Sequence, residues 1–208
     1  MDKENNTEQM ETVETADVQN ETSKKKKDSG KLDFYDISQC VISALVVGIL
    51  VFIFLFRVIG VRGNSMLSTL HNGDRVVASG VFYTPKNGDV IILKSDYYDQ
   101  PLVKRVIAIE NQEVDIDFSQ GVVYVDGVAL DEPYIYEATY VDEGFTGPVT
   151  VPEGCVFVMG DNRNESNDSR SPTIGFIDER EIFGKVYWLL FPTDGRGGYD
   201  WDRFGAVK

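Results

Sequence analysis

Hydrophobic and polar positions divide the chain into three parts. Residues 1–31 contain few apolar side chains and are rich in Glu, Asp, Asn, Thr and Lys. Residues 37–56 are 20 consecutive residues without a charge, about the number that a helix needs to cross the hydrocarbon core of a bilayer. From Val61 onward, short apolar runs alternate with turn residues. The pattern predicts a polar tail, an apolar helix and a mostly β domain.

The apolar run at residues 37–56 is interpreted as a retained membrane anchor. A cleavable signal peptide has a shorter apolar core and a small-residue cleavage site just after it. Here Arg57 and a further apolar stretch follow instead. A buried core helix is the alternative, but a charge-free run of this length with a basic flank favours the membrane.

Basic residues on the two sides of the apolar run predict its orientation. The lysines at positions 24–27 and 31 outnumber Arg57 and Arg62, so the positive-inside rule places the N-terminus in the cytoplasm. The tail before the run is too poor in apolar residues to offset its ordering entropy. The expected organisation is a disordered cytoplasmic tail at 1–35, a transmembrane helix at 36–59 and an extracytoplasmic β domain at 60–208.

Residues 60–208 are expected to form one antiparallel β domain without internal repeats. Runs rich in Val, Ile, Tyr and Phe are bounded by Gly, Pro, Asn and Asp, which is typical of short strands. Asp126-Gly127 lies between two alternating runs and predicts a tight hairpin. Asn72-Gly73 and Asn87-Gly88 predict turns, and residues 173–184 one short helical turn. The expected strands lie within 74–83, 88–94, 101–109, 121–130, 146–160 and 184–191.

Charge and cysteine content argue against several classes of function. The net charge of −14 disfavours a nucleic-acid partner, which requires a basic face. Cys40 lies in the apolar run and Cys155 in the β domain, so the two are not expected to form a disulfide. No Cys/His cluster has the spacing of a metal site. We expect no metal and no cofactor, and we expect Cys155 to be a small buried apolar residue.

A turn directly after the apolar run, GNSMLSTLHNGD at residues 63–74, offers Ser65 as a candidate nucleophile. A serine hydroxyl is weak unless a neighbouring base accepts its proton. His71 is near in sequence, but triad members meet in space, and a solvated loop histidine is the simpler interpretation. Lys104 lies in the apolar run PLVKRVIAIE, where desolvation favours a neutral amine. From this pattern alone, Lys104 could equally be a surface lysine.

Three motifs follow the apolar run in the order GNSMLSTLHNGD, KRVIAI and GDNRNESNDSR. With GDVIIL, VVYVDGVALDEPYI and VPEGCVFVMGDNR, they resemble bacterial type I signal peptidases (leader peptidases) of the short Gram-positive-like form, up to about Phe191. The resemblance implies a signal peptidase-like (LexA-like) β fold. It also implies a membrane-bound serine endopeptidase that removes signal peptides from secreted preproteins through a Ser–Lys dyad and an acyl-enzyme. Signal peptides and membrane lipid are the implied partners.

The resemblance assigns roles to individual residues. Ser65 matches the family's nucleophile and Lys104 its general base, so His71 is not expected to take part. Ser166 matches the serine whose hydroxyl orients the lysine amine. Carboxylates and guanidiniums within one loop can pair and support such a dyad. The residues that match the family's bracing positions are Asp161, Arg163, Asp168 and Arg170.

The same resemblance points to substrate-binding residues and to departures from the family pattern. Val103 is expected to line the pocket for small side chains, and Met66 follows the nucleophile as it usually does. Gly63 stands where some members have a hydroxyl residue that helps to hold the oxyanion, so the backbone N–H of Ser65 is expected to carry more of that role. Ser68 replaces the usual proline, and residues 108–112 replace a Gly-Leu-Pro-Gly-Asp loop.

Two other classes of protein are weaker alternatives. A non-catalytic anchored module would be expected to lack the serine or the lysine, and this chain has both Ser65 and Lys104. A self-cleaving repressor-type Ser–Lys protease would need a cytoplasmic DNA-binding domain, whereas an acidic tail and an apolar run precede the β domain here.

Overall fold

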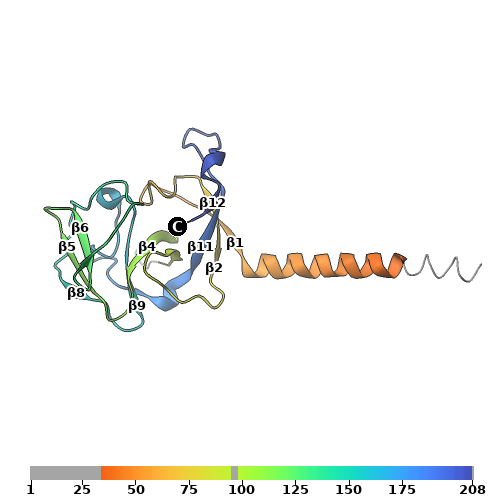
Figure 1. The fold of residues 1–208 in the computed structure, drawn as a ribbon, viewed down its shortest axis with the longest axis horizontal. Helices are drawn as coiled ribbons and strands as arrows, with labels where there is room; N and C mark the ends of the chain where they lie inside the picture. The colour runs from red at the N-terminus through yellow and green to blue at the C-terminus, as the bar shows by residue number, and fades with distance from the viewer. Residues whose placement is uncertain (1–33, 95–97, 208) are drawn as a thin grey trace, which may run out of the picture. The chain divides into compact units, whose positions relative to one another are not determined.

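The computed structural model describes residues 34–94 and 98–207, which form an apolar helix and a β domain (Figure 1). The predicted disordered tail at 1–35 lies outside the described residues except for Phe34 and Tyr35, which are helical rather than disordered. The chain divides into two units between Ile53 and Phe54, and each is described by itself. Within the described residues, the prediction of a mostly antiparallel β protein with one N-terminal apolar helix is confirmed.

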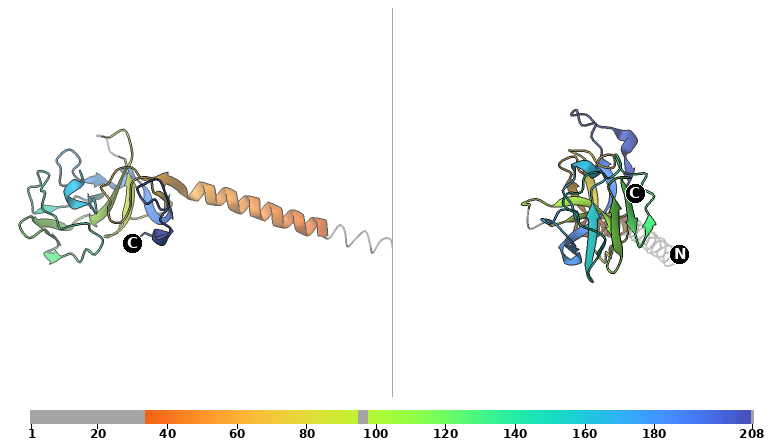
Figure 2. Two further views of the ribbon diagram at one scale, coloured as in Figure 1. Left: turned by 90° about the horizontal axis from the view of Figure 1, so that it is seen from above. Right: turned by 90° about the vertical axis from the view of Figure 1, so that its left-hand side faces the viewer.

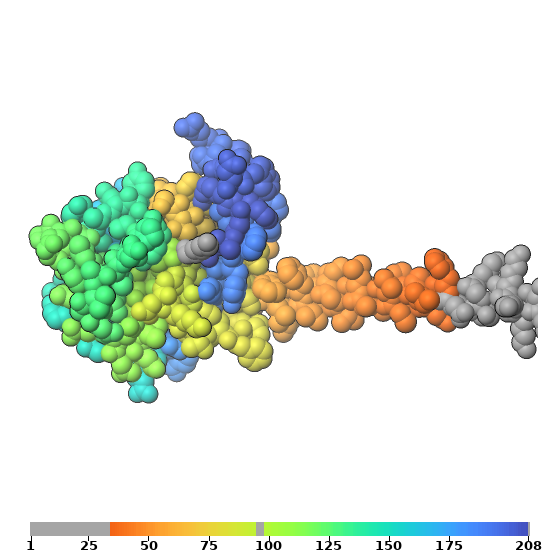
Figure 3. Space-filling view, viewed as in Figure 1, coloured from red at the N-terminus to blue at the C-terminus, as the bar shows by residue number. Residues whose placement is uncertain are grey.

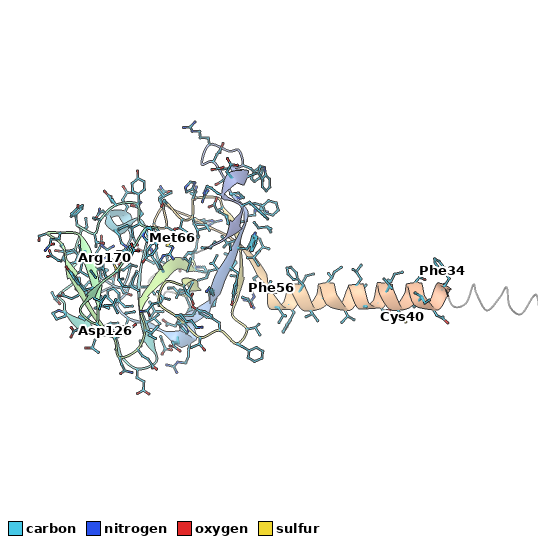
Figure 4. The ribbon with its side chains drawn as sticks, in the orientation of Figure 1. Phe34, Cys40, Phe56, Met66, Asp126 and Arg170 are labelled. Atoms are coloured by element: carbon cyan, nitrogen blue, oxygen red, sulfur yellow. The ribbon has the colours of Figure 1, made fainter. Side chains whose placement is uncertain are left out.

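The helix runs from Phe34 to Leu55 and is long and apolar enough to cross a membrane. None of its central side chains is buried, and Figure 4 labels Cys40 on its surface. A helix that is apolar on all sides is typical of a membrane span. The sequence placed the end of this helix at residue 59, but the structure ends it at Leu55. Residues Arg57–Gly60 form strand β1 instead, because they pair with residues 75–78 of the next strand.

The larger sheet carries both ends of the β domain and is antiparallel throughout. Strand β11, late in the sequence, lies between β2 and β3 and joins the two parts of the sheet. The strand order is β1-β2-β11-β3-β4-β9-β10, with β12 paired to β11. The bounds are β1 Arg57–Gly60, β2 Arg75–Ser79, β3 Val90–Leu93, β4 Leu102–Ala108, β9 Cys155–Met159, β10 Ile177–Asp178, β11 Ile182–Phe191 and β12 Gly205–Ala206.

A smaller sheet, with the order β7-β6-β5-β8, forms the other side of the domain (Figure 1). Asp126 and Gly127 both have positive φ, +52° and +75°, and join β6 to β7 in the predicted hairpin. Such angles at both central residues favour the Asx-Gly pair found here. The bounds are β5 Glu113–Asp117, β6 Val122–Val125, β7 Val128–Ala129 and β8 Val149–Thr150.

Each expected strand range overlaps at least one strand and each expected turn is a turn, although the last strand, β11, begins at Ile182, two residues before its expected range. Residues 72–73 and 87–88 are turns, and the helical turn predicted within 173–184 is a 3₁₀ turn, η2 Glu179–Glu181. Two further 3₁₀ turns are η1 Arg163–Glu165 and η3 Trp201–Arg203. The segment between β11 and β12 projects from the domain and is drawn in dark blue in Figures 2 and 3.

One hydrophobic cluster fixes the segment between β1 and β2 on the larger sheet. Met66 and Leu70 of this segment are buried against Val76, Ile92 and other sheet residues. Figure 4 labels Met66 within the domain. The segment therefore has a fixed position on the sheet although it contains no strand of its own.

Candidate active site

The predicted nucleophile, Ser65, lies in the segment between β1 and β2 and is half-buried. Its neighbour Met66 is 2% exposed and anchors the segment in the core. On the other side, the backbone carbonyl of Ser65 accepts the N–H of Asn162 at 3.0 Å. The side-chain amide of Asn162 also donates to the carbonyl of Asn64 at 3.1 Å. The position of Ser65 is thus set both by core packing and by the GDNR motif.

Lys104, the predicted base, is in the middle of β4 and is 3% exposed. Its Nζ donates to Oγ of Ser166 at 2.9 Å, and the Ser166 hydroxyl donates to Oδ2 of Asp168 at 2.8 Å. Burial lowers the pKa of Lys104 from 10.5 to about 8, and the negative charge of Asp168 opposes this shift only in part. Desolvation disfavours an ammonium, so this amine loses its proton far more readily than a surface lysine.

Gly160 brings the two predicted catalytic elements together. A Cβ atom at this position would lie 2.2 Å from Oγ of Ser166 and 2.4 Å from the carbonyl oxygen of Ser65. Both atoms therefore lie in the space that a side chain would fill, so the backbone of Ser65 and the hydroxyl that accepts the Lys104 amine both approach Gly160 closely. Sequence reasoning gave Gly160 no role. Its place at the start of the GDNR motif was the available signal, because an isolated glycine after a strand can mark close approach of another backbone.

Asp168 and Arg170 form a buried ion pair within one loop. Nε of Arg170 donates to Oδ1 of Asp168 at 2.8 Å, and both side chains are fully buried. Arg170 also donates to the carbonyls of Arg163 at 2.6 Å and Val141 at 2.6 Å. Burial by itself would raise the pKa of Asp168, but the bonds and charge of Arg170 hold it below its usual value. Asp168 thus presents a carboxylate to Ser166.

The other two predicted bracing residues pair outside this loop. Asp161 accepts Nε and Nη2 of Arg105, both at 2.7 Å, in a bidentate pair that is almost completely buried. Arg163 pairs with Glu132 and donates to its Oε2 at 3.0 Å. The expectation that these charges pair with one another therefore holds only for Asp168 and Arg170.

Arg105 follows Lys104 in β4 and was given no role from the sequence. Its guanidinium lies 3.8 Å from the centre of the Tyr134 ring and also donates to the carbonyl of Gly88 at 2.7 Å. Through Asp161, it holds β4 against the loop that carries Ser166. The bidentate geometry needs the planar fork of arginine, which lysine lacks.

A cleft of about 440 Å³ opens beside Ser65. Its lining includes the three predicted substrate-binding residues, Gly63, Met66 and Val103, together with Ser65. Apolar residues of β1, β3 and β4, or directly beside these strands, form most of the remaining wall, namely Ile59, Val61, Ile92, Pro101 and Leu102. The site can therefore hold an extended chain with small apolar side chains next to a serine hydroxyl.

Comparisons with known proteins give the family. The family model described as signal peptidase, peptidase S26, matches residues 35–191. The chain belongs to the signal peptidase family. It is 39% identical over 165 residues to a probable signal peptidase I-1 of Synechocystis sp., covering 74% of this chain and 81% of the relative. It is 35% identical over 180 residues to a signal peptidase I of Bacillus licheniformis, covering 82% and 95%.

A crystal structure of a signal peptidase I from Enterococcus faecalis matches with 31% identity and a TM-score of 0.42, covering 50% of this chain and 97% of that one. The resemblance drawn from the motifs is confirmed by the family match and by these relatives. The matched region of this signal peptidase includes the apolar helix, which indicates a membrane-anchored hydrolase.

His71 of this signal peptidase belongs to a separate cluster. It is half-buried rather than solvated, and its Nδ1 lies 2.9 Å from Nη1 of Arg203. Arg203 follows the matched region, and its Nη2 donates to Oδ2 of the buried Asp74 at 2.8 Å and to the carbonyl of Thr69 at 3.1 Å. Burial by itself would raise the pKa of Asp74, but hydrogen bonds led by Arg203 lower it. The C-terminal segment thereby braces the segment that carries Ser65.

Within the described part of the chain, no cluster of three or more His, Cys, Asp or Glu side chains could hold a metal ion. Cys40 and Cys155 are free thiols. Cys155 is half-buried rather than fully buried as expected, because it lies at the end of β9 and packs only partly against the core.

Proposed function

We propose that this chain removes signal peptides from secreted preproteins by a Ser65–Lys104 dyad that works through an acyl-enzyme. One observation carries the proposal. Lys104 is buried, has a lowered pKa and donates to Ser166, whose hydroxyl shares the space at Gly160 with the carbonyl of Ser65. In a member of the signal peptidase family, this arrangement supports a lysine that acts as a base toward the serine.

The reaction begins with the neutral amine of Lys104. As Oγ of Ser65 attacks the carbonyl carbon of the scissile peptide bond, Nζ of Lys104 takes the hydroxyl proton. The C–N bond then breaks, the same proton passes from Lys104 to the leaving amine, and an ester links Ser65 to the signal peptide. Water then attacks the ester carbonyl as Lys104 takes one of its protons, the bond to Oγ of Ser65 breaks, the signal peptide leaves as a free acid, and Lys104 returns the proton to Oγ. With a pKa of about 8, roughly a tenth of Lys104 is already neutral at pH 7.

Ser166 and Asp168 act on the amine rather than on the substrate. Ser166 fixes the direction of Nζ, and its own hydroxyl is fixed by the carboxylate of Asp168. The backbone N–H of Ser65 holds the oxyanion. Gly63 has no hydroxyl to add a second donor, and loss of one such donor costs about 10²–10³ in rate where it has been tested.

The cleft beside Ser65 receives the residues before the cut. An extended peptide adds as a strand along the cleft walls, and alternate side chains enter the pocket. Signal-peptide cleavage sites carry small residues at the first and third positions before the cut. Val103, Met66 and Gly63 form the matching shallow wall.

The proposed topology places the tail in the cytoplasm and the β domain outside, as the lysines before the helix favour. Ser65 is nine residues after Phe56, which allows at most about 30 Å of extended chain. The cut is therefore made near the outer surface of the membrane, where cleavage sites emerge.

Cleavage of a fluorogenic peptide with an Ala-x-Ala site tests the proposal. The detergent-solubilised full chain is compared with Ser65→Ala, Lys104→Ala and His71→Ala. The first two changes should abolish cleavage, whereas the third should leave most of it, because His71 faces Arg203. A Lys104→Ala variant that stays active, or a wild-type chain that cuts nothing, would contradict the mechanism.

A further inference from the structure

One hydrogen bond spans the proposed substrate cleft at its rim. Nη1 of Arg62 donates to Oε1 of Gln100 at 3.1 Å, and the two residues are 38 positions apart in the sequence. Both side chains are exposed and both line the cleft. Arg62 is the only charged residue among the described residues of the lining. An otherwise uncharged cleft thus has one cation, held across it by an uncharged partner.

The position of this bond along the cleft follows from the chain. The walls extend from Ser65 back to Ile59 and from Val103 back to Gln100, so both run away from the catalytic serine toward lower residue numbers. Arg62 precedes Ser65 by three residues, which corresponds to at most about 10 Å of backbone. A strand laid along these walls with its scissile bond at Ser65 would have its second to fourth residues before the cut within reach of this level.

We propose that Arg62 is a specificity-determining residue that favours a carboxylate side chain on the substrate at the second or fourth position before the cut. The inference rests on the proposed function. When the side chains at the first and third positions enter the pocket, alternation turns those at the second and fourth toward the rim. A glutamate there replaces the amide oxygen of Gln100 with a carboxylate, and a guanidinium binds a carboxylate, which carries the opposite charge and can accept two parallel bonds, more strongly than a neutral amide. A lysine at the same position meets a like charge.

The expected size of the effect is modest because the rim is exposed. Solvent-exposed ion pairs contribute little, so the preference for Glu over Gln should be about two- to fivefold in kcat/KM. The preference should appear mainly in KM, since the carboxylate contacts Arg62 in both the ground state and the transition state. It should decrease with added salt, because the interaction is between exposed charges.

The test uses one Ala-x-Ala peptide with Glu, Gln or Lys at the second or the fourth position before the cut. Cleavage by the full chain is measured in an uncharged detergent, so that no anionic lipid competes for Arg62. The wild type should prefer Glu to Gln and Gln to Lys at one of the two positions. Arg62→Gln should remove this order and Arg62→Glu should reverse it. Arg196→Glu, the same charge change at an exposed loop residue outside the cleft, should keep the wild-type order.

The peptide with Gln separates the two ways of failing. If the wild type does not cut it, or if Ser65→Ala cuts it equally well, the proposed function fails and the inference fails with it. If it is cut in a Ser65-dependent way but Glu, Gln and Lys are treated alike, the inference alone is overturned. The same holds if Arg62→Glu keeps the wild-type order, or if Arg196→Glu reverses it.

Discussion

A methyl group at Gly160 would enter the space between the backbone carbonyl of Ser65, the proposed nucleophile, and the hydroxyl of Ser166, which accepts the Lys104 amine. Its Cβ would lie 2.4 Å from the carbonyl oxygen of Ser65 and 2.2 Å from Oγ of Ser166, whereas such contacts need at least 3.0 Å. Each atom would have to retreat by more than half an ångström. Displacements of about 1 Å in a catalytic arrangement can cost about 10²-fold in rate, so Gly160→Ala should lower kcat/KM by roughly 10- to 100-fold.

Stability should change less than activity. Inserting a methyl group into a packed site typically costs about 1–3 kcal/mol, so the variant should still fold. Peptide cleavage is measured without urea at a temperature at which each variant is folded. The free energy of unfolding of each variant is measured in parallel by urea denaturation. Gly48→Ala is the matched control, because a Cβ at Gly48 meets nothing within 4 Å. A Gly160→Ala variant with more than a third of wild-type kcat/KM would show that Ser65 and Ser166 tolerate separation, which would refute the argument.

Three further predictions concern buried charges. The kcat/KM for peptide cleavage, which reports the protonation state of the free enzyme, should rise about tenfold per pH unit below pH 8 and level off above pH 8, because only neutral Lys104 accepts a proton. A kcat/KM that is already constant from pH 6 upward would contradict this. Arg105→Ala should lower the free energy of unfolding in urea by about 3–5 kcal/mol, since it leaves the carboxylate of Asp161 buried and unpaired; a loss below 1 kcal/mol would oppose that view. The pKa of Asp74 is lower in the folded chain than its ordinary value of 3.8, so its carboxylate stabilises the fold at pH values above 3.8, and this stabilisation is lost as the pH falls through the folded pKa. Arg203→Ala should therefore make the free energy of unfolding less dependent on pH between pH 7 and pH 3.

The elements of the fold were largely predictable because their signals are local. Asp126-Gly127 predicted its hairpin through the backbone angles that these residue types allow. Strand β1 was missed because Val58 and Ile59 continue the apolar run, and hydrophobicity alone does not distinguish the end of a helix from a strand that follows. Strand β5 was missed because acidic residues alternate with its two buried ones, Val114 and Ile116.

The site was predictable only where motifs carry it. Ser65 and Lys104 were found because the residues around them resemble a family, but their supporting partners lie far away in the sequence. Arg105 and Asp161 are 56 positions apart, and no periodicity relates them. The role of Gly160 is a close approach in space, which leaves no trace in the sequence except the glycine itself.

The order of strands in the larger sheet has a consequence for when this protein can act. Ser65 belongs to the part formed by β1 and β2, Lys104 belongs to the part formed by β3, β4, β9 and β10, and strand β11 lies between them. A ribosome has made both residues once it passes position 104, but the sheet hydrogen bonds that join the two parts are made only with residues 182–191. A growing chain that already carries Ser65 and Lys104 therefore still lacks the strand that joins the two parts of the sheet. We therefore expect no cleavage by a chain that has not yet added strand β11.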